Sequence, residues 1–304
     1  MADIVKRTLG RTGYEVTALA YGAMELRGAP RGRDIDPEEA GRILNAALDG
    51  GINMIDTSID YGVSEELIGR YIPHRRNEYF LASKCGCWAG DSEPPADAAL
   101  TGGRFPHVFT RKNIVAGVEQ SLRRMNTDHL DLVQFHASPS PSVLEQHGAV
   151  EALLDLQREG KIRFLGMSGT LPNLPDQIGL GVFDAFQIPY SAVEREHEDA
   201  MARACEAGAG VIVRGGVAKG DPDGGGHGGD RWALWDKANL NELLEGMTRT
   251  QFMLRYTISN PSMHTTIVGT ANADHLADNL RTAELGPLPP DVYAEAQRRL
   301  SEAE

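Results

Sequence analysis

Three short apolar runs lead into side chains that can move protons. The runs cover residues 52–55, 79–83 and 131–135, and each is followed directly by a carboxylate, an ammonium or an imidazole. A phenol lies five residues beyond the carboxylate. If the runs are neighbouring parallel strands, their carboxyl ends meet at one edge and these side chains share one pocket. The candidate catalytic residues are therefore Asp56, Tyr61, Lys84 and His136.

The chemistry that fits this set is general acid catalysis at a carbonyl group. A free phenol titrates near ~10, and a nearby ammonium lowers that pKa by stabilising the phenolate. A lysine ending an apolar strand costs free energy unless it is paired, and Asp56 is the obvious partner of Lys84. Tyr61 would then protonate the carbonyl oxygen while His136 positions it.

Each of these residues also has an ordinary structural explanation when taken singly. Asp56 could cap a turn, Tyr61 could be a loop aromatic, and His136 could be a buried histidine with satisfied hydrogen bonds. A lysine at a strand end can reach solvent with its charged head. The functional interpretation therefore depends on the four residues occurring together.

A nucleophile is missing from the set, because no serine or cysteine stands beside a base. Cys85 and Cys87 form a C-x-C rather than the C-x-x-C pair of a zinc site, and His136 has no second histidine next to it in the sequence. We therefore expect no metal site and ordinary thiols. A hydride from a bound cofactor would fill the gap.

Composition excludes several other classes of protein. The chain has 304 residues and a net charge of −13, which disfavours nucleic acid and anionic lipid as partners. It has no run of about 18 apolar residues, as a membrane span requires, and no apolar signal-peptide core near residue 1. Three cysteines, an odd number, do not make a disulfide framework. We expect a reduced, cytoplasmic protein.

Eight short β patterns alternate with amphipathic helical patterns. That number favours one (β/α)8 TIM barrel domain over residues 1–304, and a doubly wound sheet is disfavoured because no G-x-G-x-x-G opens the first helix. Residues 7–16 predict a β-hairpin that plugs the N-terminal mouth. The predicted strands are 19–22, 52–56, 79–84, 131–136, 163–168, 183–188, 210–214 and 265–269.

Helix signals and long loops complete this arrangement. Asp36 and Pro37 predict a helix start, Thr110 predicts another, and residues 143–159 are predicted as one helix. Segments 88–109 and 220–230 follow predicted strands, so both would be long loops at the C-terminal face, where barrel enzymes hold their sites. A tolerated surface insertion is the alternative interpretation of each.

Several motifs together resemble the aldo-keto reductase family. They lie at residues 53–62, 64–65, 81–84, 134–136, 166–168, 183–187 and 267–270, with His275, Leu276 and Asn279, and the resemblance runs from about residue 6 to residue 300. It implies a (β/α)8 barrel that reduces aldehydes and ketones with NADPH and without a metal. It also implies that the tyrosine of the set is the general acid.

The resemblance further implies a set of cofactor contacts. Ser168 and Gln187 would hold the nicotinamide carboxamide. The expected cofactor-binding residues are Gly22, Ser168, Gln187, Arg214, Gly269, Thr270, His275 and Asn279. We also expect backbone amides at the start of the last barrel helix to hold an anion, and the glycine-rich segment 223–229 to cover the cofactor pyrophosphate.

The chain departs from the family at four of the cofactor positions. Gly169 stands where an asparagine often follows the serine, and Arg214 replaces a tyrosine that stacks on the nicotinamide. Gly269 and His275 occupy places where many members have a lysine and an arginine for the 2′-phosphate. NADP(H) is still predicted over NAD(H), because the pattern around residues 269–279 resembles a bacterial-type subset that commonly uses NADPH.

The substrate pocket is expected to be apolar and aromatic, with a small-molecule carbonyl compound as substrate. Met24, Trp88 and Trp232 are its candidate lining residues, although the tryptophans could equally pack loops onto the barrel. The protein is expected to be a monomer or a weak homo-oligomer. Two alternatives stay open: a nucleotide-binding regulatory or interaction subunit with little turnover, and a metal-dependent barrel hydrolase.

Overall fold

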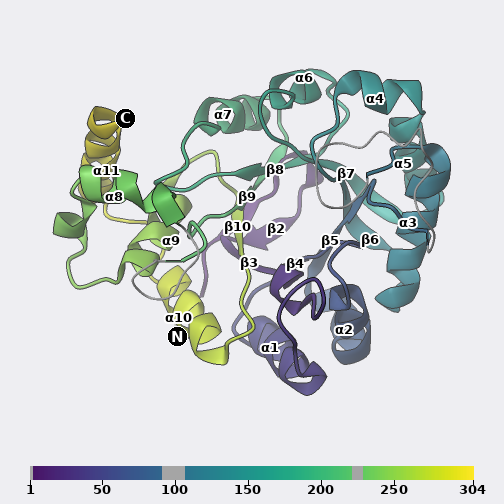
Figure 1. Ribbon diagram of the computed structural model, residues 1–304, viewed down its shortest axis with the longest axis horizontal. Helices are drawn as coiled ribbons and strands as arrows, with labels where there is room; N and C mark the ends of the chain where they lie inside the picture. The colour runs from purple at the N-terminus through teal and green to yellow at the C-terminus, as the bar shows by residue number, and fades with distance from the viewer. Residues whose placement is uncertain (1–2, 91–106, 221–228) are drawn as a thin grey trace.

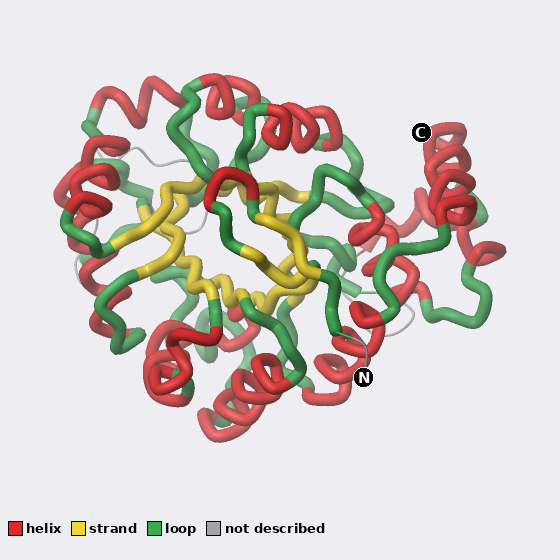
Figure 2. The backbone as a smooth tube through the Cα atoms, turned by 180° about the vertical axis from the view of Figure 1, so that it is seen from behind, coloured by secondary structure: helices red, strands yellow, loops and turns green. Residues whose placement is uncertain are grey.

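Eight parallel strands close into a barrel surrounded by helices, as predicted. The computed structural model describes residues 3–90, 107–220 and 229–304, and Figures 1 and 2 show the ring of strands inside the helical layer. The strands pair in the order β10-β3-β4-β5-β6-β7-β8-β9. Their bounds are β3 Leu19–Gly22, β4 Met54–Asp56, β5 Phe80–Cys85, β6 Leu130–Phe135, β7 Ile162–Ser168, β8 Ala185–Pro189, β9 Gly210–Arg214 and β10 Thr265–Val268.

The two predicted helix starts are confirmed, and a side chain caps each of them. Asp36 and Thr110 accept hydrogen bonds from the first turns of α1 and α3. The α-helices are α1 Pro37–Asp49, α2 Ser64–Tyr71, α3 Arg111–Arg124, α4 Pro141–Gln146, α5 Ala149–Arg158, α6 Leu174–Gly179, α7 Glu198–Glu206, α8 Ala233–Lys237, α9 Arg249–Ser259, α10 Ala273–Glu284 and α11 Pro290–Ala303. Short 3-10 helices are η1 Gly10–Thr12, η2 Ala23–Leu26, η3 Pro73–Glu78, η5 Gly229–Trp232 and η6 Leu240–Leu243.

One predicted helix is interrupted. The segment 143–159 contains two helices, α4 and α5, and they are separated at Gly148. Gly148 has a φ of +59°, a left-handed conformation that a continuous right-handed helix does not contain.

Within the described part of the chain, no helix is long and apolar enough to cross a membrane.

The N-terminal hairpin closes the bottom of the barrel. Strands β1 (Lys6–Thr8) and β2 (Glu15–Thr17) pair in antiparallel fashion, and Figure 2 shows them lying across the ring of strands. Leu9 and Val16 belong to the apolar cluster that fills the barrel interior, and the Tyr14 ring lies 5.0 Å from the ring of Phe80. The predicted plug is therefore confirmed, with apolar side chains as its contact surface.

Gly10 allows the plug to approach the barrel this closely. Its φ is +50°, and a Cβ atom there would overlap the backbone of Ala209 and Gly210 at the start of β9. A side chain would thus meet both an unfavourable backbone conformation and rigid main-chain atoms. The plug is fitted to the barrel by backbone contact as well as by side-chain packing.

Strand register brings the polar residues to one end of the barrel. Asp56 on β4 pairs with Ala82 on β5, and Lys84 lies two residues further along β5. Lys84 pairs with Gln134 on β6, and Ser168 on β7 pairs with Gln187 on β8. Because the strands are parallel, these residues gather at the carboxyl-terminal mouth.

Candidate active site

The Asp56 carboxylate is held by three buried side chains. Lys84 Nζ lies 2.5 Å from its Oδ1 atom, while the amide nitrogens of Gln134 and Gln187 each donate to its Oδ2 atom over 2.9 Å. Lys84 Nζ also donates to the carbonyl oxygen of Thr57 over 2.8 Å. These donors hold the carboxylate in a fixed orientation.

Lys84 remains an ammonium in spite of its burial. Burial opposes the charge, but the Asp56 carboxylate and the neighbouring Tyr61 outweigh it and raise the pKa of Lys84. The buried pair explains how an apolar strand can end in a lysine, because each charge compensates the other. The predicted contact between Asp56 and Lys84 is present.

Tyr61 lies over this pair, in the loop between β4 and α2. Lys84 Nζ is 5.0 Å from the centre of the Tyr61 ring, and a turn in which Tyr61 N donates to Ser58 O over 2.9 Å sets the loop. Burial raises the pKa of Tyr61, and the Lys84 ammonium offsets only part of that effect. The expected net decrease in the pKa of Tyr61 is therefore wrong. Burial of the phenolate raises its free energy by more than the nearby ammonium lowers it.

His136 follows β6 and faces both Tyr61 and a thiol. Its ring stands edge-on to Tyr61, with ring centres 6.2 Å apart, and its Nδ1 atom is 3.1 Å from the Sγ atom of Cys87. Burial, together with the nearby cations, lowers the pKa of His136 well below its usual range. Burial likewise raises the pKa of Cys87 to about 12. A neutral imidazole and a neutral thiol therefore stand side by side.

A second histidine lies beside His136, contrary to expectation. The ring of His107 is 5.2 Å from that of His136, because His107 forms an isolated antiparallel bridge with Cys87. Cys87, His107 and His136 each offer one possible metal-ligating atom, and these atoms all lie within 4.8 Å of one another. The only sequence signal for His107 was its position at the end of a long loop at the C-terminal face.

Arg214 ends β9 at the same mouth. Burial lowers the pKa of its guanidinium, and within the described ranges no hydrogen bond or ion pair engages that group. Glu194, a nearby carboxylate, is instead 2.8 Å from Arg231. A largely buried cation with this environment favours an anionic or aromatic ligand.

Two glycines shape the junction between β3 and β10. A Cβ atom on Gly269 would overlap the carbonyl oxygen of Gly22, so no side chain fits at residue 269 without a shift of the backbone. Next to it, Tyr21 Oη donates to Thr270 O over 2.7 Å, and Thr270 Oγ1 accepts from Asn272 N over 3.0 Å. Close strand contact therefore accounts for the glycine that replaces the family's lysine.

Fewer backbone amides at the start of α10 can donate to an anion than expected. Asn272 caps the helix and accepts hydrogen bonds from Asp274 N over 2.8 Å and His275 N over 3.2 Å. Two of the amides expected to bind an anion are therefore already engaged. The His275 side chain is exposed, whereas Asn279 is buried one turn further along the helix.

The strand ends of β7 and β8 supply the two candidate carboxamide contacts. Ser168 and Gln187 are both buried there, but the Gln187 amide nitrogen is engaged by Asp56, which leaves its oxygen for a ligand. A Cβ atom on Gly169 would lie 2.6 Å from Gln177 Oε1 and 2.7 Å from Leu174 Cδ1. The missing asparagine thus reflects a position already filled by α6.

The three candidate substrate-pocket residues differ in exposure. Met24, on η2 just beyond β3, is 43% exposed, and Trp88 is partly exposed. Trp232 is only 3% exposed, with its ring 5.2 Å from Trp235 and its Nε1 atom donating to Ala218 O over 3.4 Å. This placement favours the alternative in which Trp232 packs a loop onto the barrel.

Parts of the two segments that were predicted as long loops lie outside the described residues. They are 91–106 and 221–228, and the second contains nearly all of the glycine-rich segment predicted to cover the pyrophosphate. That prediction therefore stays a prediction.

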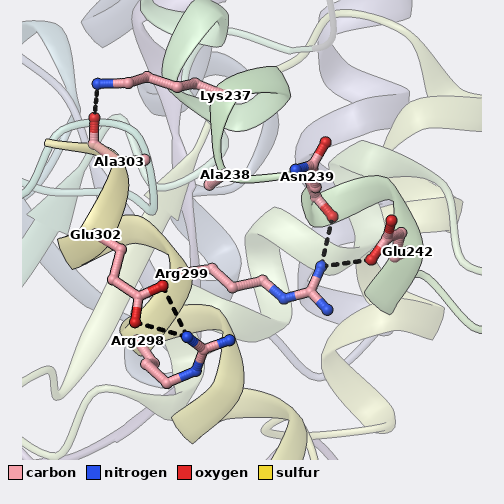
Figure 3. Close-up of a pocket in the computed structure, with 8 residues that line it drawn as sticks. All are labelled: Lys237, Ala238, Asn239, Glu242, Arg298, Arg299, Glu302 and Ala303. Atoms are coloured by element: carbon pink, nitrogen blue, oxygen red, sulfur yellow. Dashed lines mark hydrogen bonds and ion pairs between the residues drawn. The ribbon is translucent and has the colours of Figure 1, made fainter.

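A surface cavity of about 400 Å³ lies between α8, η6 and α11 (Figure 3). In Figure 1, α8 and α11 lie at the edge of the molecule, away from the strands. Its two arginines are paired with carboxylates: Arg298 Nη1 is 2.6 Å from Glu302, and Arg299 Nη1 is 2.8 Å from Glu242. Lys237 donates to the carbonyl oxygen of Ala303. Because both arginines are neutralised and none of the mouth residues lines the cavity, we place the candidate site at the barrel mouth.

Comparisons with known proteins show which proteins the whole chain is similar to. The model of the aldo/keto reductase family matches residues 18–299. The uncharacterized oxidoreductase YqkF of Bacillus subtilis is 26% identical over 296 residues, which cover 91% of this chain and 90% of YqkF. A putative voltage-gated potassium channel subunit beta of Schizosaccharomyces pombe is 26% identical over 94% of this chain and 90% of its own.

Solved structures show the same likeness. The holo form of the aldo-keto reductase AKR11C1 from Bacillus halodurans superposes with a TM-score of 0.81 at 27% identity, covering 98% of this chain and 96% of that one. The likeness therefore extends over nearly the whole barrel.

Proposed function

This chain belongs to the aldo/keto reductase family of oxidoreductases, and on that premise we propose that it reduces aldehydes or ketones to alcohols with NADP(H). Tyr61 is the general acid in this proposal. The observation that carries it is the buried Asp56–Lys84 pair beneath the Tyr61 phenol, with His136 facing the same space.

Tyr61, Lys84 and Asp56 each have a separate role in the proposed proton transfer. Tyr61 is neutral at the start because burial raises its pKa, so it holds the proton that the carbonyl oxygen needs. As that proton leaves, the Lys84 ammonium stabilises the phenolate that develops. Asp56 keeps Lys84 charged and fixed throughout. A bound nicotinamide would supply the hydride.

The Cys87 thiol fixes the orientation of His136 in this proposal. Because both groups are neutral, the thiol can donate to Nδ1 over their 3.1 Å separation. The ring proton then lies on Nε2, where it can donate to a substrate carbonyl oxygen and direct that oxygen toward Tyr61. A neutral imidazole donates without adding a charge to the site.

The residues at the mouth fit a nicotinamide dinucleotide. The Arg214 guanidinium needs an anionic or planar partner, and it can stack on a ring or bind a phosphate. Ser168 and the amide oxygen of Gln187 can hold a carboxamide group. Thr270, the exposed His275 and Asn279 are the remaining candidates on the β10–α10 side. We retain NADP(H) over NAD(H), with Arg214 and His275 as the available cationic groups for a 2′-phosphate.

The test is a Tyr61→Phe variant assayed for nucleotide binding and for turnover. We expect reduction of an aldehyde panel to fall by about 10²–10⁴-fold, the usual contribution of a general acid. Fluorescence titration should still show NADPH binding close to that of the natural chain and tighter than NADH binding. Retained turnover would refute the role of Tyr61, and tighter NADH binding would refute the cofactor preference.

One relative is named as a putative potassium channel subunit, so a regulatory or interaction subunit is the alternative function to test. A regulatory or interaction subunit would bind the nucleotide but turn over the carbonyl panel negligibly, and it would copurify with a larger partner. Rapid turnover by the natural chain, lost in Tyr61→Phe, favours the reductase.

A further inference from the structure

We propose that Cys87, His107 and His136 form a zinc-binding site at the barrel mouth, and that zinc bound there blocks carbonyl reduction. The zinc site itself rests on the geometry of the three side chains. The blocking effect rests in addition on the proposed role of His136 in positioning the substrate.

The distances are close to those that zinc requires. In a tetrahedral site with Zn–S near 2.3 Å and Zn–N near 2.0–2.1 Å, neighbouring ligand atoms are roughly 3.3–3.6 Å apart. Cys87 Sγ and His136 Nδ1 are already 3.1 Å apart, and the ligating atoms of all three residues lie within 4.8 Å of one another. A ring movement of about 1 Å by His107 would complete the triangle.

The elements that carry the ligands hold them near this geometry. Cys87 lies two residues beyond the end of β5, His136 directly follows β6, and the bridge between Cys87 and His107 ties the third ligand to the first. Cys87 and His107 are buried, whereas His136 is partly exposed toward the mouth. Three protein ligands with one open side are typical of zinc sites that keep a fourth position for water or substrate.

The donor types select a borderline metal over a hard one. Thiolate and imidazole ligands suit zinc, whereas magnesium and calcium require oxygen ligands. Histidine binds a metal through an unprotonated ring nitrogen, and His136 already turns its Nδ1 atom toward the Cys87 sulfur. When zinc binds, the covalent S–H bond of Cys87 is replaced by a sulfur–zinc bond. The thiol proton leaves to solvent, and no oxidation state changes.

Neighbouring charges oppose tight binding. The Lys84 ammonium and the Arg214 guanidinium both act electrostatically on His136, and a divalent cation would be repelled by each. Asp56 is already neutralised by Lys84. The structure therefore favours a reversible, inhibitory zinc site over a permanently filled one.

Occupancy would interfere with the proposed reaction in two ways. Zinc would take Nδ1 of His136 and the thiol that orients it, and it would place a second cation beside the carbonyl position. The metal and its water would also fill space between His136 and the loop that carries His107. We expect loss of turnover with nucleotide binding retained.

The experiment compares the full-length natural chain with His107→Gln. Zinc affinity is measured by competition with a chromophoric zinc indicator, with and without NADPH, and NADPH oxidation by a carbonyl substrate is followed at the same zinc concentrations. Cobalt(II) is added in place of zinc to look for thiolate-to-metal charge-transfer absorption. His147→Gln and Cys205→Ser are the controls, because neither residue belongs to the cluster.

We expect the natural chain and both controls to bind one zinc per chain and to lose activity as it binds. His107→Gln should keep its zinc-free activity and bind zinc at least about 10-fold more weakly, because even loss of an outer-shell partner costs 10–100-fold in affinity. Equal affinity in His107→Gln, or no thiolate absorption with cobalt, would overturn the site.

Zinc binding without loss of NADPH oxidation would overturn the blocking effect while leaving the site intact. If the natural chain reduces no carbonyl compound even without zinc, the proposed function fails. The indicator competition and the cobalt spectrum would still report on the site, so the two failures can be told apart.

Discussion

Replacing Lys84 with methionine tests the buried pair beneath Tyr61. The change removes the ammonium but leaves the Asp56 carboxylate buried, with only the amide groups of Gln134 and Gln187 as donors. Removing one partner of a buried ion pair costs about 3–5 kcal/mol, because the remaining charge stays desolvated and unpaired. We therefore expect Lys84→Met to lower the free energy of unfolding by that amount.

The expected change in melting temperature follows from the size of the chain. Unfolding entropy near 60 °C is about 2.1 cal/mol/K per residue, or roughly 0.6 kcal/mol per degree for 304 residues. Lys84→Met should then melt about 5–8 °C below the natural chain in a circular dichroism or calorimetric scan.

Lys161→Met provides the matched control. Lys161 Nζ lies 2.8 Å from both Glu119 and Glu159, but the lysine is partly exposed, and exposed pairs contribute only about 0–1 kcal/mol. This variant should melt within about 1–2 °C of the natural chain. An equal shift in the two variants would refute the claim that Lys84 compensates a buried carboxylate.

Two further predictions follow from the pKa directions and from the plug. The pKa of His136 is held well below its usual range, so kcat/KM for reduction should show no inflection near pH ~6.5. The pKa of Tyr61 is raised, so kcat/KM should not fall until the pH exceeds ~10. A break near pH ~6.5 in the measured profile would contradict the neutral imidazole. Gly10→Ala should lower the unfolding free energy by about 1–3 kcal/mol more than Gly13→Ala, since both residues have positive φ but only Gly10 meets backbone atoms; equal melting temperatures would count against the close fit of the plug.

The barrel and its strand ends were predictable because burial on both faces leaves a strong local signal. Strands 19–22 and 210–214 match β3 and β9 at both ends, since an apolar run bounded by glycine or charge is a short-range pattern. The predicted helix 143–159 was wrong in its continuity. Its apolar spacing continues through Gly148, so the periodicity did not reveal the left-handed residue that divides α4 from α5.

The candidate site was predictable where strand ends alone determine position. Asp56 and Lys84 come together because neighbouring parallel strands end at the same mouth. His107 was missed because it pairs with Cys87 although it lies 20 residues further along the chain, and no local sequence pattern predicts that contact. The net pKa shift of Tyr61 was missed for a related reason: one neighbouring ammonium can be inferred from strand order, but the extent of burial cannot.

Two of the four departures from the family's cofactor pattern, Gly169 and Gly269, have a packing cause, and this bears on where a nucleotide would be held. Gly22 leaves no room for a side chain at Gly269, and Gln177 with Leu174 fills the space beside Gly169. The Asn272 cap also engages two amides at the start of α10. With those positions closed, Arg214 is the main candidate to bind an anionic cofactor, because its partly buried guanidinium has no ion pair among the residues described here. The same cation opposes zinc at His136, so a nucleotide whose phosphates neutralise Arg214 should strengthen zinc binding. NADPH, whose nicotinamide ring carries no positive charge, is therefore expected to increase the zinc affinity of the Cys87–His107–His136 cluster.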